Sequence, residues 1–136
     1  MIRWAIDGVL AASHRPGYTG GNRSQVSADE VSEWLEHVKE LGVAAIICLL
    51  HDDQLAYYSS IPNGLLDYYR QSGFDVRHVP VCDHLSPPLT TEQLEAVWRH
   101  FQQLKKPVLV HYSAGVDRTG LASRHIQSLL RDPHSG

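Results

Sequence analysis

Apolar and polar residues alternate along the chain in blocks that predict strands and helices in turn. Val43 to Leu50 is a continuous apolar run, too short for a typical helix and too unbroken for a half-exposed strand, so it predicts a strand covered on both faces. Val108 to Val110 predicts another buried strand, and Phe74 to Val81, which alternates in part, predicts a third. The opening segment, Ile2 to Ser13, predicts one or two short strands with a break near Gly8.

The segments between these strands carry helix signals. Ser27 to Glu30 forms a capping box ahead of apolar residues at helical spacing, and Gly42 marks the end of that helix. Thr90 to Gln93 forms a second capping box, and Pro107 blocks continuation of the helix that follows it. Residues 63–72 and 119–130 predict two more helices, residues 14–26, 51–61, 83–89 and 111–118 predict loops, and residues 131–136 are expected to fray.

This alternation of strand and helix predicts the fold class. It favours an α/β architecture, in which a parallel or mixed sheet carries helices on both faces. A chain of 136 residues is expected to form a single domain, spanning residues 1–136. Ligands of such sheets bind at the carboxyl ends of the strands. The loop after Val110 lies at such an end and leads directly into a helix.

Composition and net charge argue against several kinds of function and binding site. The formal net charge of −3 argues against broad binding of nucleic acid or anionic membranes, and no apolar run approaches the length of a membrane span. The nine histidines form no HxH or HExxH pattern, so no metal site and no cofactor are expected. Two cysteines, Cys48 and Cys82, suggest neither a disulfide framework nor a zinc site, which fits a cytoplasmic setting. We expect a monomer.

The segment VHYSAGVDRTG, residues 110–120, carries the candidate chemistry. It joins a buried strand to a helix through a loop with a central glycine. Successive backbone N–H groups of such a loop can converge on one point, where the helix dipole and the Arg118 guanidinium add positive potential. The pattern predicts a small anion-binding cup, although an ordinary strand-to-helix turn is the alternative. The residues expected to surround the anion are Ser113, Ala114, Gly115, Val116, Asp117 and Arg118.

The same segment resembles the signature loop of the protein tyrosine phosphatases, V-H-C-x-x-G-x-x-R-[ST]-G. The matching residues are Val110, His111, Gly115, Arg118, Thr119 and Gly120. The segment departs from that pattern at Tyr112, where the family keeps its nucleophilic cysteine. The resemblance implies the protein tyrosine phosphatase fold, with a central mixed, mostly parallel sheet flanked by helices on both faces.

Two further segments extend the resemblance over most of the chain. Val79 to Pro88 is similar to the loop that carries the family's general acid, and Asp83 takes the acid position, with an ordinary turn residue as the alternative. Gly8 to Gly17 is similar to the N-terminal segment of small archaeal and bacterial members. Compared with many relatives the chain stops early after the signature helix, so it resembles a minimal dual-specificity phosphatase.

The resemblance also implies a mechanism and a role for each matching residue. In the family a cysteine thiolate attacks phosphorus, and the roles carried over here are phosphoryl binding for Arg118, leaving-group protonation for Asp83, assistance to the departing thiol for Thr119, and loop orientation for His111. Tyr112 takes the nucleophile position, but a phenol has a reference pKa of about 10 against about 8.5 for a thiol. Its ring either plugs the cup, with its oxygen near Arg118, or swings out and leaves the cup open.

Several functions stay open on the sequence alone. The chain resembles a phosphatase that acts on a phosphorylated protein or a small phosphomonoester, and Tyr112 is expected to impair its catalysis. The alternatives are a pseudophosphatase that binds phosphorylated ligands without turnover, a scaffold for protein contacts, and an enzyme that uses Tyr112 itself as nucleophile. The sequence Asp-Arg-Thr-Gly, which begins at Asp117, also occurs in lipid-directed and broad-specificity relatives, which leaves a phosphoinositide-type phosphatase as a further alternative; a solvent-facing loop residue is the other interpretation of Asp117.

Two residues expected near the phosphate-binding loop, Arg15 and Cys82, each have two possible roles. Arg15 and the glycine-rich loop after it either border the cleft and touch substrate or belong to a plain surface loop. Cys82, beside Asp83, is either a redox partner of a thiol at position 112 in a parent enzyme or a plain buried thiol.

Overall fold

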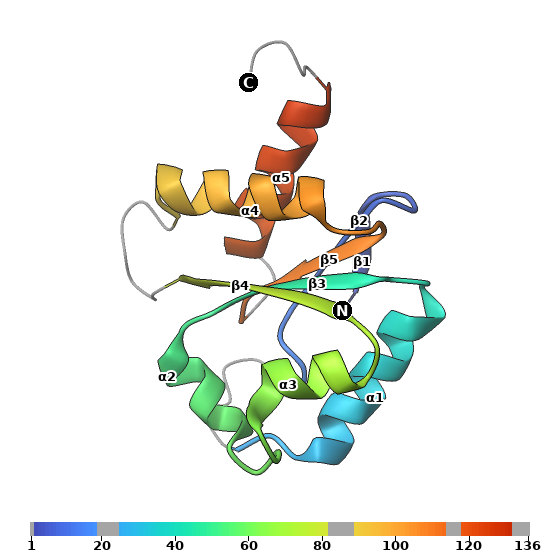
Figure 1. The fold of residues 1–136 in the computed structure, drawn as a ribbon, viewed down its shortest axis with the longest axis vertical. Helices are drawn as coiled ribbons and strands as arrows, with labels where there is room; N and C mark the ends of the chain where they lie inside the picture. Colours follow the sequence, from blue (N-terminus) through green and yellow to red (C-terminus); the bar gives the residue numbers. More distant parts are fainter. Residues whose placement is uncertain (1, 19–24, 82–88, 114–117, 132–136) are drawn as a thin grey trace.

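A five-stranded sheet forms the centre of the computed structural model, which describes residues 2–18, 25–81, 89–113 and 118–131. The strands lie in the order β1-β2-β5-β3-β4 (Figure 1). Their bounds are Arg3–Ile6 for β1, Leu10–Ser13 for β2, Ala45–Leu50 for β3, Asp75–Val81 for β4 and Val108–His111 for β5. The edge strand β1 runs antiparallel to β2, whereas β2, β5, β3 and β4 pair in parallel. The predicted mixed, mostly parallel sheet is therefore confirmed.

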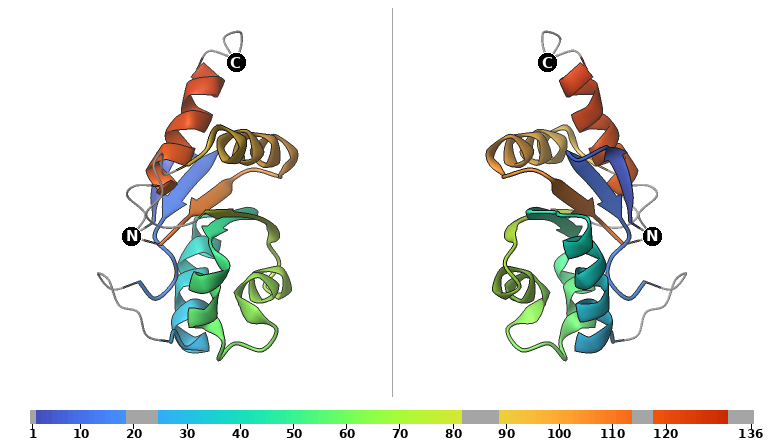
Figure 2. Two further views of the ribbon diagram at one scale, coloured as in Figure 1. Left: turned by 90° about the vertical axis from the view of Figure 1, so that its left-hand side faces the viewer. Right: turned by 90° about the vertical axis from the view of Figure 1, so that its right-hand side faces the viewer.

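Helices cover both faces of this sheet, as Figures 1 and 2 show. One face carries α1 (Ala28–Glu40), α2 (Asp52–Leu55), the 3-10 turn η1 (Ala56–Tyr58) and α3 (Gly64–Gln71). The opposite face carries α4 (Thr91–Gln103) and α5 (Arg118–Arg131). A separate apolar cluster fills each side of the sheet, and β3 is fully buried between them, as its unbroken apolar run predicts. Among the described helices, none combines the length and apolar character that a membrane span requires.

Both predicted capping boxes are present. The Ser27 hydroxyl accepts from the backbone N–H of Glu30 at the start of α1, and the Glu30 carboxylate accepts from the Ser27 N–H in return. Thr90 and Gln93 form the same reciprocal pair at the start of α4. Gly42 follows α1 with a φ of 79°, a conformation that glycine adopts without steric cost.

The structure corrects several predicted boundaries. Residues 51–61, predicted as a loop, contain the short helix α2 and the turn η1. His111, predicted as the first loop residue, is the last residue of β5, and α5 begins at Arg118 and extends to Arg131. Strand and helix ends depend on long-range pairing as well as local pattern, which accounts for shifts of one or two residues.

Candidate active site

The carboxyl ends of three neighbouring strands meet at one edge of the sheet. In the strand register, His111 of β5 lies between Ser13 of β2 and Cys48 of β3. Beyond this edge the chain continues from β5 through Tyr112 and Ser113 toward the start of α5. The candidate loop therefore leaves the sheet where ligands of parallel sheets bind.

His111 is fully buried and hydrogen-bonded through both ring nitrogens. Its Nδ1 lies 3.1 Å from the carbonyl oxygen of Tyr112, and its Nε2 lies 3.0 Å from the hydroxyl of Tyr69 on α3. A carbonyl oxygen can only accept, so Nδ1 carries the proton, and Nε2 accepts from the Tyr69 hydroxyl. This arrangement fixes the imidazole as one neutral tautomer at the root of the loop.

Burial keeps this pair neutral. Desolvation lowers the pKa of His111 to about 4, opposed by the hydrogen bond to Tyr112 and reinforced by the charges of His14 and Arg15. Desolvation likewise holds the pKa of Tyr69 well above its usual value, so its hydroxyl stays a donor. The Trp34 ring, 5.4 Å from the imidazole centroid in an edge-on arrangement, closes the third side. His111 thus acts as a structural hydrogen-bonding group at neutral pH.

Tyr112 faces the opposite side of the sheet. Its side chain is 4% exposed and belongs to the apolar cluster beneath α4 and α5. Consecutive residues leaving a strand point to opposite faces, which explains why His111 packs toward α1 and α3 while Tyr112 packs toward α5. The ring therefore does not extend into solvent.

Ser113, the next residue, is tied to the N-terminal part of the chain. Its carbonyl oxygen accepts from the backbone N–H of Arg15 at 2.8 Å, and Nε of Arg15 lies 3.4 Å from its hydroxyl oxygen. Arg15 is 1% exposed, so the interpretation that it belongs to a plain surface loop is wrong. The sequence could not locate this contact, because the two residues lie 98 positions apart.

The structure does not describe the side chains of the remaining predicted site residues. Ala114, Gly115, Val116, Asp117, Cys82 and Asp83 lie outside the described residues. Arg118 and Thr119 open α5, and the placement of their side chains lies outside the described part as well. β4 ends at Val81 and runs parallel to β3 and β5, so the chain enters the Asp83 segment at the same edge of the sheet as Tyr112. The roles expected for these residues stay predictions.

Comparison with known proteins identifies the family. A family model described as "Polymorphic toxin system, DSP-PTPase phosphatase" matches residues 20–129, which is most of the chain. The chain belongs to this family. The curated proteins contain no match to the chain.

Solved phosphatase structures share the fold of this DSP-PTPase domain. Tk-PTP in a mutant form gives a TM-score of 0.64 at 23% identity, covering 98% of this chain and 74% of that chain. Tk-PTP in its active form gives 0.60 at 21% identity, covering 98% and 84%. Kinase associated phosphatase (KAP), carrying serine in place of its catalytic-site cysteine, gives 0.68 at 23% identity, covering 89% and 65%. These likenesses support the fold of the domain.

Cys48 does not replace the thiolate that Tyr112 displaces from the DSP-PTPase signature. It lies beside His111 in the sheet, but its side chain is fully buried. Desolvation raises the pKa of its thiol to about 12. Since the thiolate is the reactive species, a thiol with this pKa is inert at neutral pH.

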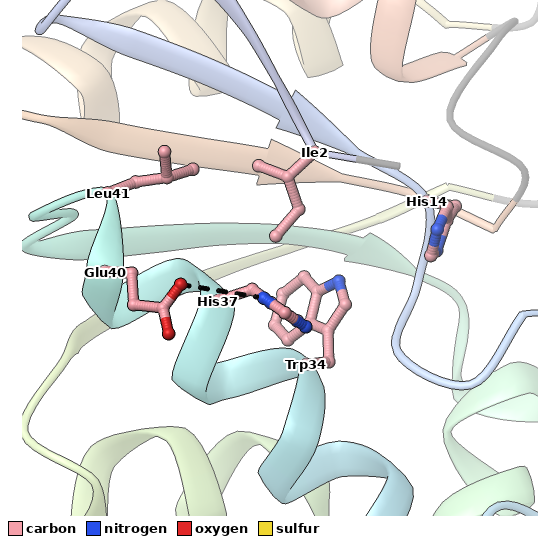
Figure 3. Close-up of a pocket in the computed structure, with 6 residues that line it drawn as sticks. All are labelled: Ile2, His14, Trp34, His37, Glu40 and Leu41. Carbon is pink, nitrogen blue, oxygen red and sulfur yellow. Dashed lines mark ion pairs between the residues drawn. The ribbon is translucent and has the colours of Figure 1, made fainter.

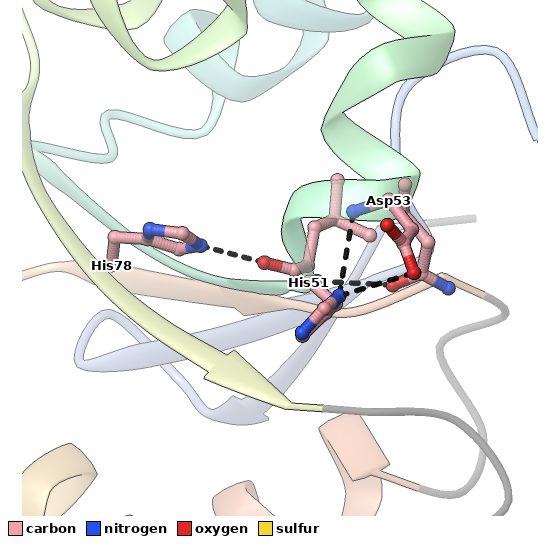
Figure 4. A network of polar contacts seen from close by, with 5 residues as sticks. His51, Asp53 and His78 are labelled. Carbon is pink, nitrogen blue, oxygen red and sulfur yellow. Dashed lines mark hydrogen bonds and ion pairs between the residues drawn. The ribbon is translucent and has the colours of Figure 1, made fainter.

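Two histidines at the same edge of the phosphatase domain form hydrogen bonds with backbone groups. Nε2 of His78 donates to the carbonyl oxygen of Leu50 at 2.6 Å, and Nδ1 of His51 caps α2 by accepting from the backbone N–H of Asp53 (Figure 4). Among the described residues, no group of three or more His, Cys, Asp or Glu side chains has the arrangement to hold a metal ion.

A groove of about 400 Å³ lies beside α1 (Figure 3). It is lined by Ile2, His14, Trp34, His37, Glu40 and Leu41. Within this lining, Nδ1 of His37 lies 3.8 Å from the Glu40 carboxylate, and both side chains are exposed. Trp34, one of the lining residues, donates its Nε1–H to the Ser13 hydroxyl at 3.2 Å and also packs edge-on against His111, so the groove and the His111 cluster share this ring.

Sequence reasoning did not assign Trp34, Tyr58 or Tyr69 to the site. Trp34 and Tyr69 occupy apolar positions of their helices, where an aromatic side chain usually signals core packing alone. The only local signal was the polar end of each ring, since a buried Tyr hydroxyl or Trp N–H normally finds a partner.

Proposed function

We propose that this domain carries, in the loop of residues 111–120, the phosphomonoester site of a DSP-PTPase phosphatase, and that hydrolysis there is severely impaired because Tyr112 replaces the nucleophilic cysteine. The observation that carries the proposal is the buried Tyr112 ring, which stands directly after the His111 end of β5. Membership of the DSP-PTPase family supports the phosphomonoester chemistry. The expected ligand is a phosphorylated protein or a small phosphomonoester.

In this proposal each signature residue keeps its family role except one. The backbone N–H groups of residues 113–117 and the guanidinium of Arg118 bind the phosphoryl oxygens. Asp83 protonates the leaving oxygen, Thr119 stands ready to assist the leaving nucleophile, and His111 orients the loop through the Tyr112 carbonyl. Without a thiolate no phosphorus–sulfur bond forms, so the two-step displacement has no first step.

A phenol is a poor substitute on two physical grounds. Its reference pKa of about 10 leaves little phenolate at neutral pH, against about 8.5 for a thiol. Its oxygen also extends from the backbone about as far as phosphorus does in a cysteine enzyme, so it competes for the phosphate position. Both grounds argue against Tyr112 as an attacking nucleophile.

The impairment is tested by phosphate release from an aryl phosphate. We expect no steady release from the chain and none from Arg118→Ala. Steady release that Arg118→Ala abolishes would contradict the proposal and would favour Tyr112 as a nucleophile, which mass spectrometry would reveal as a phosphoryl adduct on Tyr112.

A natural pseudophosphatase is the second candidate, in which phosphorylated ligands bind without turnover. Calorimetry with a phosphotyrosine peptide separates the two: affinity that Arg118→Ala removes favours the pseudophosphatase, and no affinity favours a plugged cup. A phosphoinositide-type activity is disfavoured, because Val116 occupies the place where lipid-directed relatives often carry lysine. The family description suggests that the domain is the phosphatase module of a polymorphic toxin system.

A further inference from the structure

We propose that Arg15 is a positioning residue for the phosphate-binding loop, holding Ser113 against the turn at Tyr57 and Tyr58 and adding positive charge beneath the loop. The inference rests on the proposed function for its effect on phosphate chemistry, and its structural part can be tested separately. Neither the signature motif nor the family match assigns a role to this arginine.

The first observation is a main-chain tether. The parallel pairing of β2 and β5 ends in register at Ser13 and His111, and the backbone bond from Arg15 N–H to the Ser113 carbonyl continues that register two residues further. The loop therefore leaves the sheet still attached to the N-terminal segment. The Arg15 side chain adds a second link, since its Nε lies 3.4 Å from the Ser113 hydroxyl oxygen.

The Arg15 guanidinium also contacts η1 and Tyr18. Its Nη1 donates to the Tyr58 hydroxyl at 3.2 Å, and that hydroxyl donates in turn to the carbonyl oxygen of Pro16 at 2.6 Å. The guanidinium carbon lies 5.0 Å from the ring centroid of Tyr57 and 5.5 Å from that of Tyr18, which are cation–π distances. One side chain thus links Ser113, the η1 turn and the segment after β2.

The Arg15 guanidinium is a buried positive charge near the root of the loop. A guanidinium that is 1% exposed has lost nearly all its hydration, which is costly unless nearby groups compensate. Its field reaches the root of the loop, where it helps to lower the pKa of His111. Under the proposed function, a phosphate dianion held by the loop that follows Ser113 would be attracted by the same charge, so ligand binding and Arg15 burial should favour each other.

A purely structural role makes a different prediction. If Arg15 only stabilised the fold, weakening its contacts would lower the melting temperature and leave the loop of the folded protein unchanged. A positioning residue changes the loop itself. The two roles are separated by variants that trim one contact at a time in a protein that still folds.

The structural part is tested on the chain as it exists, by backbone amide NMR. We expect Arg15→Lys and Tyr58→Phe to shift the amide signals of residues 112–118 and to speed hydrogen exchange at the residue 15 N–H. Arg70→Met, which removes an exposed arginine on α3, is the matched control and should do neither. Unmoved loop signals in folded Arg15→Lys and Tyr58→Phe would overturn the proposal.

The functional part is tested in the Tyr112→Cys background with an aryl phosphate and orthovanadate. We expect Arg15→Met to lower kcat/KM and weaken vanadate inhibition by about tenfold or more, because Ser113 loses a side-chain anchor and the root of the loop loses a buried positive charge. Arg15→Lys should recover part of the loss, Tyr58→Phe should show a smaller loss, and Arg70→Met none. Unchanged constants in Arg15→Met and Tyr58→Phe would overturn the proposal. A Tyr112→Cys protein without any activity would instead count against the proposed function and leave the NMR result to decide on Arg15.

Discussion

The Tyr69 hydroxyl on α3 lies 3.0 Å from Nε2 of His111 at the end of β5, and both groups are fully buried. The other imidazole nitrogen lies 3.1 Å from the Tyr112 carbonyl oxygen. The root of the candidate loop is therefore fixed from the face of the sheet opposite to the Tyr112 ring. A helix that carries no predicted catalytic residue controls the orientation of the loop's first peptide group.

Tyr69→Phe should destabilise the fold by about 1–2 kcal/mol, since a buried imidazole nitrogen loses its donor. Urea unfolding measures the change. Tyr68→Phe, at a half-buried neighbouring position on α3, is the matched control and should stay within about 0.5 kcal/mol of the parent. Equal losses in the two variants would count against a specific Tyr69–His111 bond.

His111 should make stability depend on pH. Burial lowers its native pKa from 6.5 to about 4, so between these values the unfolded chain binds a proton that the native protein excludes. The contribution is fully present above pH 6.5 and is lost progressively toward pH 4, by on the order of 3 kcal/mol.

An NMR titration of the ring protons measures this directly. The His111 signal should stay nearly constant from pH 8 to pH 5. A His111 midpoint near 6.5 would show that the imidazole is not the buried neutral tautomer.

Gly17 should resist substitution more strongly than Gly8. Both have positive φ, 76° and 70°, so alanine strains either backbone. A Cβ at Gly17 would also lie 2.5 Å from Cγ1 of Val26, whereas a Cβ at Gly8 meets nothing within 4 Å. We expect Gly8→Ala to cost about 1 kcal/mol and Gly17→Ala about 1–3 kcal/mol more. Chemical denaturation of both variants checks this, and a loss at Gly17 no larger than at Gly8 would refute the close packing beside Arg15.

Local sequence signals predicted the elements well where one pattern decides the structure. The Ser27 and Thr90 capping boxes, the apolar run of β3 and the mixed sheet are all confirmed. The short helix α2 was missed because its N-cap is His51, a residue that carries no strong capping preference. Its existence depends on the packing of η1 and α3 against the sheet.

Of the candidate site, only the residues that are contiguous in sequence could be predicted. The signature loop follows β5 at the expected edge of the sheet because motif and strand are contiguous in sequence. The contacts that support it join Arg15 to Ser113 across 98 positions and Tyr69 to His111 across 42. No local pattern encodes such pairings, since they arise when β2 and α3 come to lie against β5.

The most direct test of the central claim is the rate of aryl phosphate hydrolysis by Tyr112→Cys. If the loop after β5 is a complete phosphate site lacking only its nucleophile, this variant should hydrolyse the substrate at least about a hundredfold faster than the parent chain, and a further Arg118→Ala should abolish the gain. A folded Tyr112→Cys protein that releases no phosphate, or a gain that survives Arg118→Ala, would contradict the account.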